Sequence, residues 1–394
     1  MSSFPAGFTW GAATSAHQTE GNNVGSDWWR MEQATPSLTA EPSGDACDSY
    51  HRYAEDLDLL SGAGLQSYRF SVEWARIEPA PGEFSRAALD HYQRMIDACL
   101  ARGVEPVVTL HHFTNPRWLR EEDGGWTGGK VVERFQRYAD TVLSTLTGLR
   151  RVCTINEPNM IATWAGVLTH GAPAGEPMPD PRICDTLIAA HRHAAETANG
   201  LGIDAGLTVA MTAYTSDSSD EADAAIANLR RYDEDVFLEA SRDDAFVGVQ
   251  AYTRRFATSQ GLHPHGHEPG GPAARQTGTG WNYYPQSIGD CLRRAHELVP
   301  DQQLLVTENG IATTDDEERI AYTTGALESV LDAVTDGVPV GGYWHWSLLD
   351  NFEWVHGYGP TFGLVAVDRQ TFVRTPKPSL DWLGRVAKAN ALDA

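Results

Sequence analysis

The stretch Leu304-Leu305-Val306-Thr307-Glu308-Asn309-Gly310 joins a short apolar run to a glutamate. A second stretch, Val152-Cys153-Thr154-Ile155-Asn156-Glu157-Pro158, repeats this arrangement 308 − 157 = 151 residues earlier. Short runs with β-branched residues predict buried strands. Because so many residues separate Glu157 from Glu308, only the fold can bring them together. The ends of two strands of one barrel would do so.

Six further runs of this kind alternate with helical patterns along the chain. The eight predicted strands cover residues 8–11, 67–71, 105–111, 151–156, 206–212, 246–250, 303–307 and 341–346. Residues 85–100 exemplify the helices, since Ser85 can cap the first turn and apolar residues from Leu89 to Leu100 recur on one face. The pattern predicts an α/β fold, a single (β/α)8 TIM barrel domain over residues 1–394 with its active site at the C-terminal ends of the strands. No Gly-rich phosphate loop follows the first strand, which counts against a doubly wound sheet.

Composition narrows the class of protein. The 53 acidic and 30 basic residues give a net charge of −23, which would repel nucleic acid and anionic membranes. No stretch approaches the roughly 20 apolar residues of a membrane span, and the first residues lack the features of a signal peptide. The five cysteines form no CxxC pair and predict free buried thiols in a reducing cytosol. We expect a soluble cytoplasmic protein without nucleic-acid or membrane partners; its oligomeric state stays open, with a homo-oligomer among the options.

Polar side chains gather where the predicted strands end. Reading those ends in order gives Gln18, Arg69, His111, His112, Asn156, Glu157, Tyr252, Glu308 and Trp346. A random sample of strand ends would be mostly aliphatic. Because active-site residues of such barrels come from these ends, the set predicts a site with two carboxyl groups. Residues 261–281 form a long predicted loop after the sixth strand, which we expect to be mobile and to lie over the pocket.

Two carboxyl groups in one site are what cleavage of a glycosidic bond requires. When they lie about 5–5.5 Å apart, one attacks the anomeric carbon and the configuration is retained. The pair must differ in protonation, with the acid kept neutral and the nucleophile ionised. Arg69 and Tyr252 are candidates for holding Glu308 ionised. Asn156 could donate a hydrogen bond to the sugar 2-hydroxyl.

Other interpretations of these residues need weighing. A lone glutamate at a strand end is more often a solvated loop residue than a catalyst, so the hypothesis depends on both. His111 and His112 could be metal ligands, but neighbouring residues on a strand point to opposite faces and cannot easily share one ion. We therefore expect no metal and no other cofactor. A zinc hydrolase is the weakest alternative.

The sequence resembles glycoside hydrolase family 1, the retaining β-glucosidases and β-galactosidases. The resemblance runs nearly end to end. Its motifs are residues 4–21, Tyr68-Arg69-Phe70-Ser71, Leu110-His111-His112-Phe113, Thr154-Ile155-Asn156-Glu157-Pro158, Thr307-Glu308-Asn309-Gly310 and Trp346-Ser347-Leu348-Leu349-Asp350-Asn351-Phe352-Glu353-Trp354. The chain departs from the family pattern at Gln250-Ala251-Tyr252, where Asn-Tyr-Tyr is usual, and at Thr361. It is also short in the loops on the aglycone side.

The resemblance implies roles for individual residues. Glu157 would be the acid/base and Glu308 the nucleophile, supported by Arg69 and Tyr252. The sugar would be bound by Gln18, His112, Asn156, Trp346, Glu353, Trp354 and Phe362. Family members that act on 6-phosphorylated sugars lack a carboxylate at the position of Glu353. Because a carboxylate there would repel a phosphate, the resemblance implies an unphosphorylated sugar.

We therefore expect a cofactor-free retaining exo-β-glycosidase acting on small-molecule or oligosaccharide β-glycosides. Terminal unphosphorylated β-D-glucosides are the expected substrates, with β-galactosides and β-fucosides as further ones. An alternative keeps both glutamates but transfers the sugar to an alcohol, as a transglycosidase or glycosyltransferase on a secondary-metabolite aglycone. A third hypothesis, of a different class, is a non-catalytic glycan-binding barrel; the presence of both glutamates counts against it.

Overall fold

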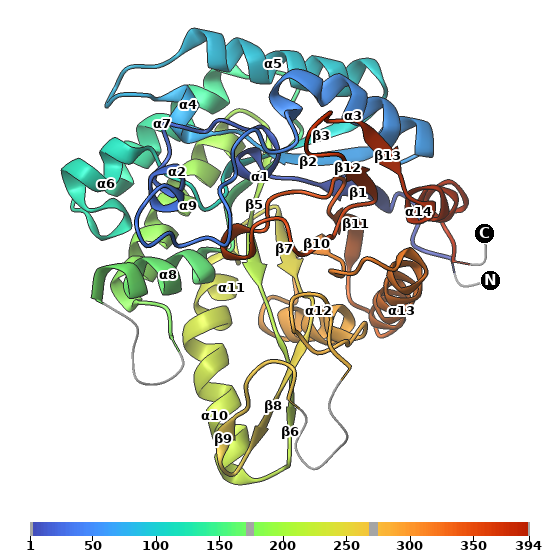
Figure 1. The fold of residues 1–394 in the computed structure, drawn as a ribbon. Coiled ribbons are helices and arrows are strands. Elements are labelled where there is room, and N and C mark those ends of the chain that lie inside the picture. Colours follow the sequence, from blue (N-terminus) through green and yellow to red (C-terminus); the bar gives the residue numbers. More distant parts are fainter. Residues whose placement is uncertain (1–2, 171–176, 268–274, 393–394) are drawn as a thin grey trace.

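Eight parallel strands close into a barrel with helices around it, as Figure 1 shows for a computed structural model that describes residues 3–170, 177–267 and 275–392. The strands follow one another around the barrel in the order β1-β11-β10-β7-β5-β4-β3-β2. Their bounds are β1 Thr9–Ala13, β2 Ser67–Ser71, β3 Glu105–His111, β4 Arg151–Asn156, β5 Asp204–Ala210, β7 Phe246–Gln250, β10 Leu304–Asn309 and β11 Val340–Trp346. The predicted (β/α)8 barrel is thus confirmed.

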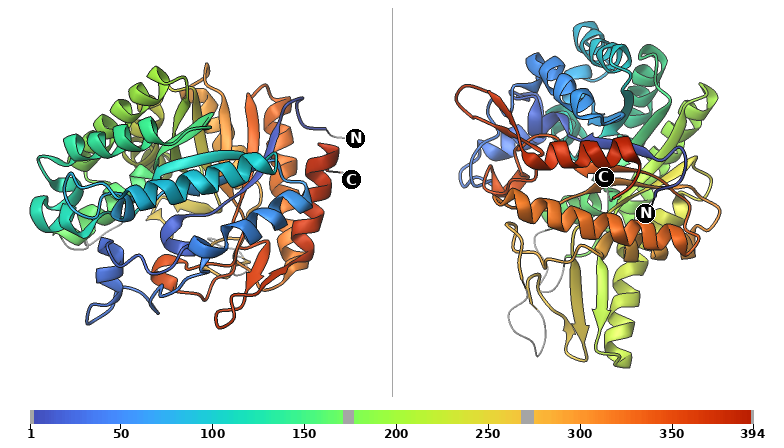
Figure 2. Two further views of the ribbon diagram at one scale, coloured as in Figure 1. Left: turned by 90° about the horizontal axis from the view of Figure 1, so that it is seen from above. Right: turned by 90° about the vertical axis from the view of Figure 1, so that its right-hand side faces the viewer.

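Helices connect consecutive barrel strands and cover the outside of the barrel, as the two views of Figure 2 show. Their bounds are α1 Ala16–Thr19, α2 Asp27–Glu32, α3 Ser49–Ala63, α4 Trp74–Ile77, α5 Arg86–Ala101, α6 Arg117–Asp123, α7 Val131–Thr145, α8 Pro158–His170, α9 Pro181–Gly200, α10 Asp220–Arg230, α11 Val236–Ala240, α12 Ser287–Leu298, α13 Asp316–Thr335 and α14 Pro378–Ala389. Short turns of other helix types are η1 Gly125–Thr127, η2 Arg231–Asp235 and η3 Trp354–His356. Because both faces of the barrel sheet are covered, its strands are buried almost throughout.

The local signals in the sequence act as expected. The Ser85 hydroxyl accepts a hydrogen bond from the backbone N–H of Ala88 (3.2 Å) and caps α5. Leu89 and Ile96 on this helix are buried, whereas Leu100 in its last turn is 47% exposed. All five cysteines are free and buried, as predicted.

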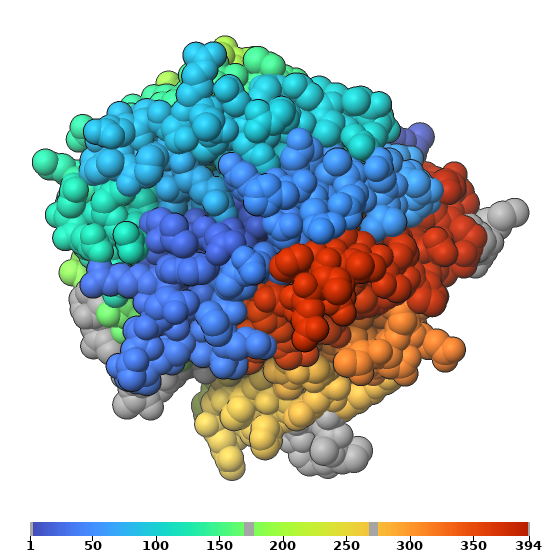
Figure 3. All heavy atoms as spheres, turned by 45° about the horizontal axis from the view of Figure 1, so that its top comes forward, coloured from blue at the N-terminus to red at the C-terminus, as the bar shows by residue number. Residues whose placement is uncertain are grey.

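The two ends of the chain meet at the N-terminal end of the barrel. The N–H of Phe4 donates to the backbone oxygen of Asn390 (2.9 Å), and the Trp10 indole donates to the Asn390 side chain (2.9 Å). Phe4, Phe8 and Trp10 pack together with ring centroids 4.7 to 4.9 Å apart and are buried there. Figure 3 shows the N-terminal and C-terminal segments side by side on one face of the molecule.

Three further strands form a small sheet that extends away from the barrel beside α10 (Figures 1 and 2). It consists of β6 Ala213–Ser216, β8 Arg254–Thr258 and β9 Gly261–Leu262. The predicted long loop 261–281 therefore begins with a short strand, and residues 268–274 of it lie outside the described residues. A hairpin of β12 Val365–Val367 and β13 Arg374–Pro376 precedes the last helix. No helix in the described part of the chain combines the length and the apolar character that crossing a membrane requires.

Candidate active site

One cavity of about 420 Å³ lies at the C-terminal ends of the barrel strands. This volume is typical of sites for small molecules. Among the residues that line it are Gln18, His112, Asn156, Glu157, Tyr252, Glu308, Trp346, Glu353, Trp354 and Phe362. The remaining predicted site residue, Arg69 on β2, is 1% exposed and contacts Glu308 from below the cavity surface. The fold therefore brings these residues together, whereas His111, which also stands at a predicted strand end, does not line the cavity.

The backbone places Glu157 at the cavity wall through an uncommon conformation. β4 ends at Asn156, and Pro158 begins α8, so Glu157 alone turns the chain from strand to helix. Its φ of 45° lies in the left-handed region, which costs a residue other than glycine about 1–3 kcal/mol. The Glu157 N–H donates to the backbone oxygen of Thr208 on β5 (2.8 Å), and the register of β4 against β5 shifts before Asn156. These contacts fix the direction of the glutamate side chain.

Glu308 lies within β10, where the strand pairing is irregular on both sides. The register shifts between Val306 and Glu308 against β7, and between Val306 and Asn309 against β11. Such irregularities redirect side chains next to active sites. Gly310 follows the last residue of the strand, and a Cβ atom there would lie 2.0 Å from the backbone oxygen of Trp346. Only glycine allows this close approach beside the site.

Both carboxylate oxygens of Glu308 accept a hydrogen bond. Arg69 Nη1 donates to Oε1 at 2.5 Å, and the Tyr252 hydroxyl donates to Oε2 at 2.7 Å. The Glu308 side chain is buried. By contrast, no residue in the described ranges donates a hydrogen bond to the carboxyl group of Glu157, which is partly exposed to the cavity. The two carboxyl groups therefore have different surroundings.

This difference separates the two groups in protonation. Desolvation by the cavity walls and the negative charge of Glu308 raise the pKa of Glu157 well above its ordinary value. Burial also raises the pKa of Glu308, but the Arg69 charge and the hydrogen bonds from Tyr252, Arg69 and Gln250 oppose that rise. Because the donors gather on Glu308, a single negative charge on the pair is best placed there. Glu157 then carries the proton.

Asn156 is held with its amide nitrogen available as a donor. Its Oδ1 accepts hydrogen bonds from Arg69, from the Thr208 hydroxyl (3.2 Å) and from Gln250 Nε2 (3.0 Å). These three donors fix which side of the amide is oxygen. The Nδ2 atom lies 3.4 Å from His112 Nε2. Burial and the Arg69 charge lower the pKa of His112 well below its ordinary value, so this imidazole is neutral.

Gln18 and Glu353 offer acceptors to the cavity. Both amide hydrogens of Gln18 are used, because Nε2 donates to Asn351 Oδ1 (3.0 Å) and to the backbone oxygen of Phe352 (2.7 Å). The Gln18 Oε1 accepts from the Ser15 hydroxyl (2.7 Å) and keeps one lone pair. Glu353 is buried, and its Oε1 has no hydrogen-bond partner among the described residues. A ligand with hydroxyl groups would satisfy it.

Aromatic rings form one side of the cavity. His112 stacks on Trp346 with ring centroids 5.8 Å apart and an angle of 17°, and on Trp354 at 6.2 Å and 12°. Trp354 has a φ of 53°, a second strained position in the site. Tyr252 packs edge-on against Phe362 with ring centroids 6.0 Å apart, and both residues also line the cavity. Flat rings of this kind suit the C–H faces of a sugar.

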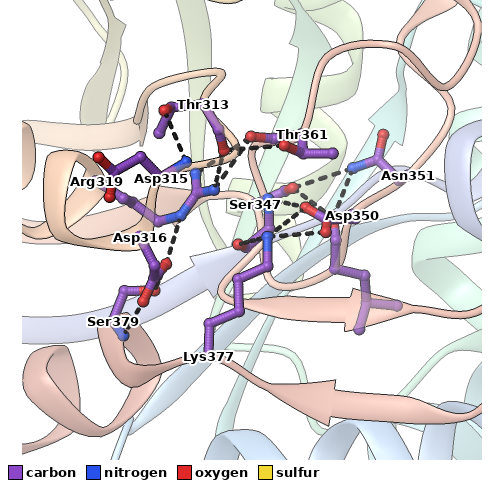
Figure 4. Close-up of polar contacts among 12 residues, drawn as sticks. Thr313, Asp315, Asp316, Arg319, Ser347, Asp350, Asn351, Thr361, Lys377 and Ser379 are labelled. Carbon is purple, nitrogen blue, oxygen red and sulfur yellow. Dashed lines mark hydrogen bonds and ion pairs between the residues drawn. The ribbon is translucent and has the colours of Figure 1, made fainter.

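A polar network outside the cavity holds the loop that carries Glu353 and Phe362. Figure 4 shows Arg319 of α13 donating to the backbone oxygens of Thr313 (2.6 Å) and Thr361 (3.2 Å). Its Nε also donates to Asp316 (3.0 Å). Because Arg319 is buried and bonds both segments, it fixes the loop against α13.

The same loop is bonded at two further points shown in Figure 4. Lys377 Nζ donates to the Asp350 carboxylate and to the backbone oxygen of Gly363, each at 2.8 Å. Asn351 Nδ2 donates to the Ser347 hydroxyl (3.0 Å), and its Oδ1 accepts from Gln18. The loop is thus held by hydrogen bonds both before and after Glu353.

The structure adds two residues to which the sequence assigns no role, Gln250 and Thr208. Each donates to Asn156, and Gln250 also supports Glu308. Gln250 is the last residue of the predicted sixth strand, a position that could have suggested it. His111 lies outside the cavity, 3.0 Å from Asn115 and edge-on to Trp126. Within the described ranges, no group of three or more His, Cys, Asp or Glu side chains could hold a metal ion.

Comparisons with known proteins agree with this geometry. The sequence model described as "Glycosyl hydrolase family 1" matches residues 1–269 and 241–392. The "Thermostable beta-glucosidase B" of Thermobispora bispora is 36% identical over 99% of this chain and 92% of its own length. The "Beta-glucosidase" of an Agrobacterium species is 32% identical over 98% of this chain and 95% of its own length.

Solved structures show the same similarity. The crystal structure of "beta-glycosidase BGL167" superposes with a TM-score of 0.88 at 42% identity, covering 98% of each chain. The "Beta-glucosidase from Thermotoga maritima in complex with glucoimidazole" superposes with a TM-score of 0.88 at 27% identity, covering all of both chains. Over its whole length, therefore, the chain belongs to glycosyl hydrolase family 1 and is a glycoside hydrolase.

Proposed function

We propose that this chain is a retaining exo-β-glycosidase that hydrolyses terminal, unphosphorylated β-D-glucosides through a covalent glycosyl-enzyme. The observation that carries the proposal is the unequal surroundings of the two carboxyl groups. Arg69 and Tyr252 each donate to Glu308, while no described residue donates to Glu157. One group is thereby prepared to act as a nucleophile and the other to hold a proton.

In the first step Glu308 attacks the anomeric carbon as the bond from that carbon to the leaving oxygen breaks. Glu157 gives its proton to this oxygen, so the aglycone leaves as a neutral alcohol. The negative charge that Glu308 loses on forming the ester no longer raises the pKa of Glu157, which is now ionised. Glu157 is then the base that the second step needs.

In the second step Glu157 takes a proton from water as the water oxygen attacks the anomeric carbon. The bond to Glu308 breaks, and its carboxylate returns to the hydrogen bonds from Arg69 and Tyr252. Two displacements at the same carbon give net retention of configuration. Both products are neutral, and the enzyme recovers its initial protonation.

The remaining cavity residues recognise the sugar. The Asn156 amide nitrogen would donate to the 2-hydroxyl, a contact that strengthens as the transition state forms. Gln18 and Glu353 would accept from sugar hydroxyls, since each has an unfilled acceptor position. His112 would add a contact as a neutral imidazole, and Trp346, Trp354 and Phe362 would enclose the ring.

The charge of the site supports an unphosphorylated glucoside. The ionised Glu308 and the carboxyl group of Glu353 line the cavity, and Arg120 is the only Lys or Arg among its described lining residues. A phosphate group would meet repulsion and little compensation. The relatives named as beta-glucosidases support glucose as the sugar. In this proposal residues 1–394 act as one cytoplasmic catalytic domain without a metal or other cofactor.

The role of Glu157 is tested by the variant Glu157→Ala. Glucosides with poor leaving groups should slow by about 10²–10⁴-fold, the usual contribution of general acid catalysis, while those with good leaving groups slow less in the first step. Added azide should restore the rate for good leaving groups, because it needs no base to attack. The role is wrong if both kinds of substrate slow equally and azide has no effect.

The reaction type is tested by a panel of aryl β-glycosides (gluco, galacto, fuco, manno, xylo and glucurono), with Glu308→Gln as the control. The gluco substrate should give the highest kcat/KM and release free glucose. A product that is mainly transferred sugar when an alcohol is added would indicate a transglycosidase. Tight binding without turnover would indicate a glycan-binding barrel. Turnover by Glu308→Gln close to that of the natural chain would refute the covalent route.

A further inference from the structure

A π turn, η2, interrupts the helical segment that runs from α10 to α11. Single π turns within α-helices are rare and occur frequently at functional sites. This one carries two neighbouring carboxyl groups, each bonded to a segment at the cavity end of the barrel. Glu234 Oε1 accepts a hydrogen bond from the N–H of Thr212, a cavity residue (2.9 Å). Asp233 Oδ1 accepts one from Asn159 Nδ2 (3.2 Å).

Asn159 links Asp233 to the acid/base glutamate. It is the second residue of α8, two positions after Glu157, and its side chain is buried. Its Nδ2 has two hydrogens, and the second acceptor is the backbone oxygen of Ala210 at the end of β5 (2.9 Å). Because Glu157 has a strained φ of 45°, contacts of this kind are needed to keep the direction of the first turn of α8. Asp233 thus helps to hold this turn, although it is not among the described residues that line the cavity.

The charges that act on Glu157 change during the proposed reaction. Burial raises the pKa of Glu157 most; Glu308 raises it further, Arg69 lowers it, and Asp233 raises it. Burial keeps the Tyr252 hydroxyl neutral by raising its pKa well above the ordinary value. In the glycosyl-enzyme Glu308 is an ester and has lost its charge. Of the two charged side chains that remain, Asp233 is the one that favours uptake of a proton by Glu157, which the second step requires.

Groups of both signs surround Asp233. They are, by element, Asp235 of η2, Arg230 of α10, Tyr214 of β6, Arg255 of β8 and Cys184 of α9. Asp235 is paired with Arg294 of α12 (2.8 Å). Burial raises the pKa of the adjacent Glu234 to about 8, so this carboxyl group is mostly neutral at pH 7. Of the two neighbouring carboxyl groups on the π turn, Asp233 is therefore the one whose charge acts on Glu157.

We propose that Asp233 is a positioning residue for the acid/base reaction: through Asn159 it fixes the start of α8, and its negative charge strengthens Glu157 as the base of the second step. This inference rests on the proposed function, because it uses the roles given there to Glu157 and Glu308. Asp233 touches neither the sugar nor the reacting atoms. If it only held Asn159 in place, an uncharged acceptor would serve equally well, and the test depends on this difference.

Asp233→Asn separates the charge from the hydrogen bond, because its amide oxygen can still accept from Asn159. Loss of the charge lowers the pKa of Glu157, so the proton needed in the first step is lost at lower pH. With a poor leaving group, the basic limb of the kcat/KM profile should move to lower pH by about 0.5–1 unit, the order of effect of one partly screened charge. With a good leaving group the second step limits kcat, which should fall about twofold to threefold because Glu157 is a weaker base, while kcat/KM changes little.

Asp233→Ala removes the acceptor as well as the charge. Its basic limb should move as far as that of Asp233→Asn, and kcat/KM at the optimum should fall further, because Asn159 loses a partner. Asp233→Glu restores a carboxylate and should bring the limb back toward that of the natural chain. Glu239→Gln on α11 is the matched control, since it removes the same charge from a side chain that is 58% exposed and does not act on Glu157. Its profile should coincide with that of the natural chain.

The proposal is overturned if the basic limb stays in place in both Asp233→Asn and Asp233→Ala, or if Glu239→Gln moves it equally far. Absence of turnover in the natural chain would refute the proposed function instead. A carbon-13 NMR titration of labelled glutamate in the folded protein needs no turnover and would still decide this inference. A lower pKa of Glu157 in Asp233→Asn supports it, and an unchanged pKa overturns it.

Discussion

The hydrogen bond from Tyr252 to Glu308 makes a prediction about the pH dependence of the reaction. In Tyr252→Phe the carboxylate keeps the Arg69 contact at Oε1 but loses the hydroxyl donor 2.7 Å from Oε2. A hydrogen bond to a charged group contributes about 1.5–3 kcal/mol. At 1.36 kcal/mol per pKa unit, its loss should raise the pKa of Glu308 by about 1–2 units.

The direction of the effect follows from which form reacts. Tyr252 stabilises the ionised carboxylate, so removing it favours the protonated form. Only the ionised form of Glu308 can attack carbon, and the rate therefore falls on the acid side. The acidic limb of the kcat/KM profile should move to higher pH by about 1–2 units. The basic limb should move little, because Glu157 sets it.

The assay is the release of an aryl leaving group from an aryl β-glucoside across the pH range in which the protein stays folded. Tyr232→Phe is the matched control, since Tyr232 is exposed and lies outside the cavity lining. Its profile should coincide with that of the natural chain. An acidic limb that stays in place in Tyr252→Phe would refute the reasoning that this hydroxyl holds Glu308 ionised.

Three further changes test separate parts of the structure. In Glu308→Gln the pKa of Glu157 should fall, because the negative charge that raises it is gone; a carbon-13 NMR titration of labelled glutamate would show this, and an unchanged value would deny the coupling. Arg319→Met should lower the free energy of unfolding by about 3–5 kcal/mol, since the buried backbone oxygens of Ile311 and Thr313 lose their donor and the partly exposed Asp316 carboxylate loses its cation. Urea unfolding would measure this loss, and a value below about 1 kcal/mol, the net worth of one ordinary hydrogen bond, would contradict the prediction. Gly310→Ala should inactivate the enzyme, because the new methyl carbon meets a backbone oxygen of the neighbouring strand at 2.0 Å, whereas Gly62→Ala, with nothing within 4 Å, should behave like the natural chain.

The barrel could be predicted from the sequence because its strands are buried on both faces. Such strands appear as continuous apolar runs, and the predicted bounds of β2, β3, β4 and β7 agree with the structure. β10 extends two residues further than predicted and includes Glu308. Strand ends are set by pairing with neighbours, and the register shifts in β4 and β10 depend on contacts that no single segment contains. The small β6-β8-β9 sheet was beyond prediction because its strands are short.

A site residue could be predicted from the pattern only where a polar or ionisable side chain stands at the end of a predicted strand. Glu157 and Glu308 meet that condition, and the fold brings them to one place with Arg69, which lies in the middle of β2. Gln250 and Thr208 act through hydrogen bonds to Asn156, which depend on the direction of each side chain in the barrel. The exposure of Trp164 and Leu168 on α8 could not be predicted either. That helix is apolar on several sides, and periodicity does not show which side faces a cavity. The same limit explains Leu100, which belongs to the apolar face of α5 but is exposed in its last turn.

The covalent bond to Glu308 is the central claim and can be observed directly. With a 2-fluoro-glucoside that has a good leaving group, the glycosyl-enzyme should accumulate. Fluorine slows both steps because it destabilises their positively charged transition states, whereas the good leaving group restores the rate of the first step only. Peptide mass spectrometry of the trapped protein should find the added fluoro-sugar on Glu308. A sugar attached to any other residue, or no attachment in a preparation that hydrolyses the unfluorinated glucoside, would contradict the account.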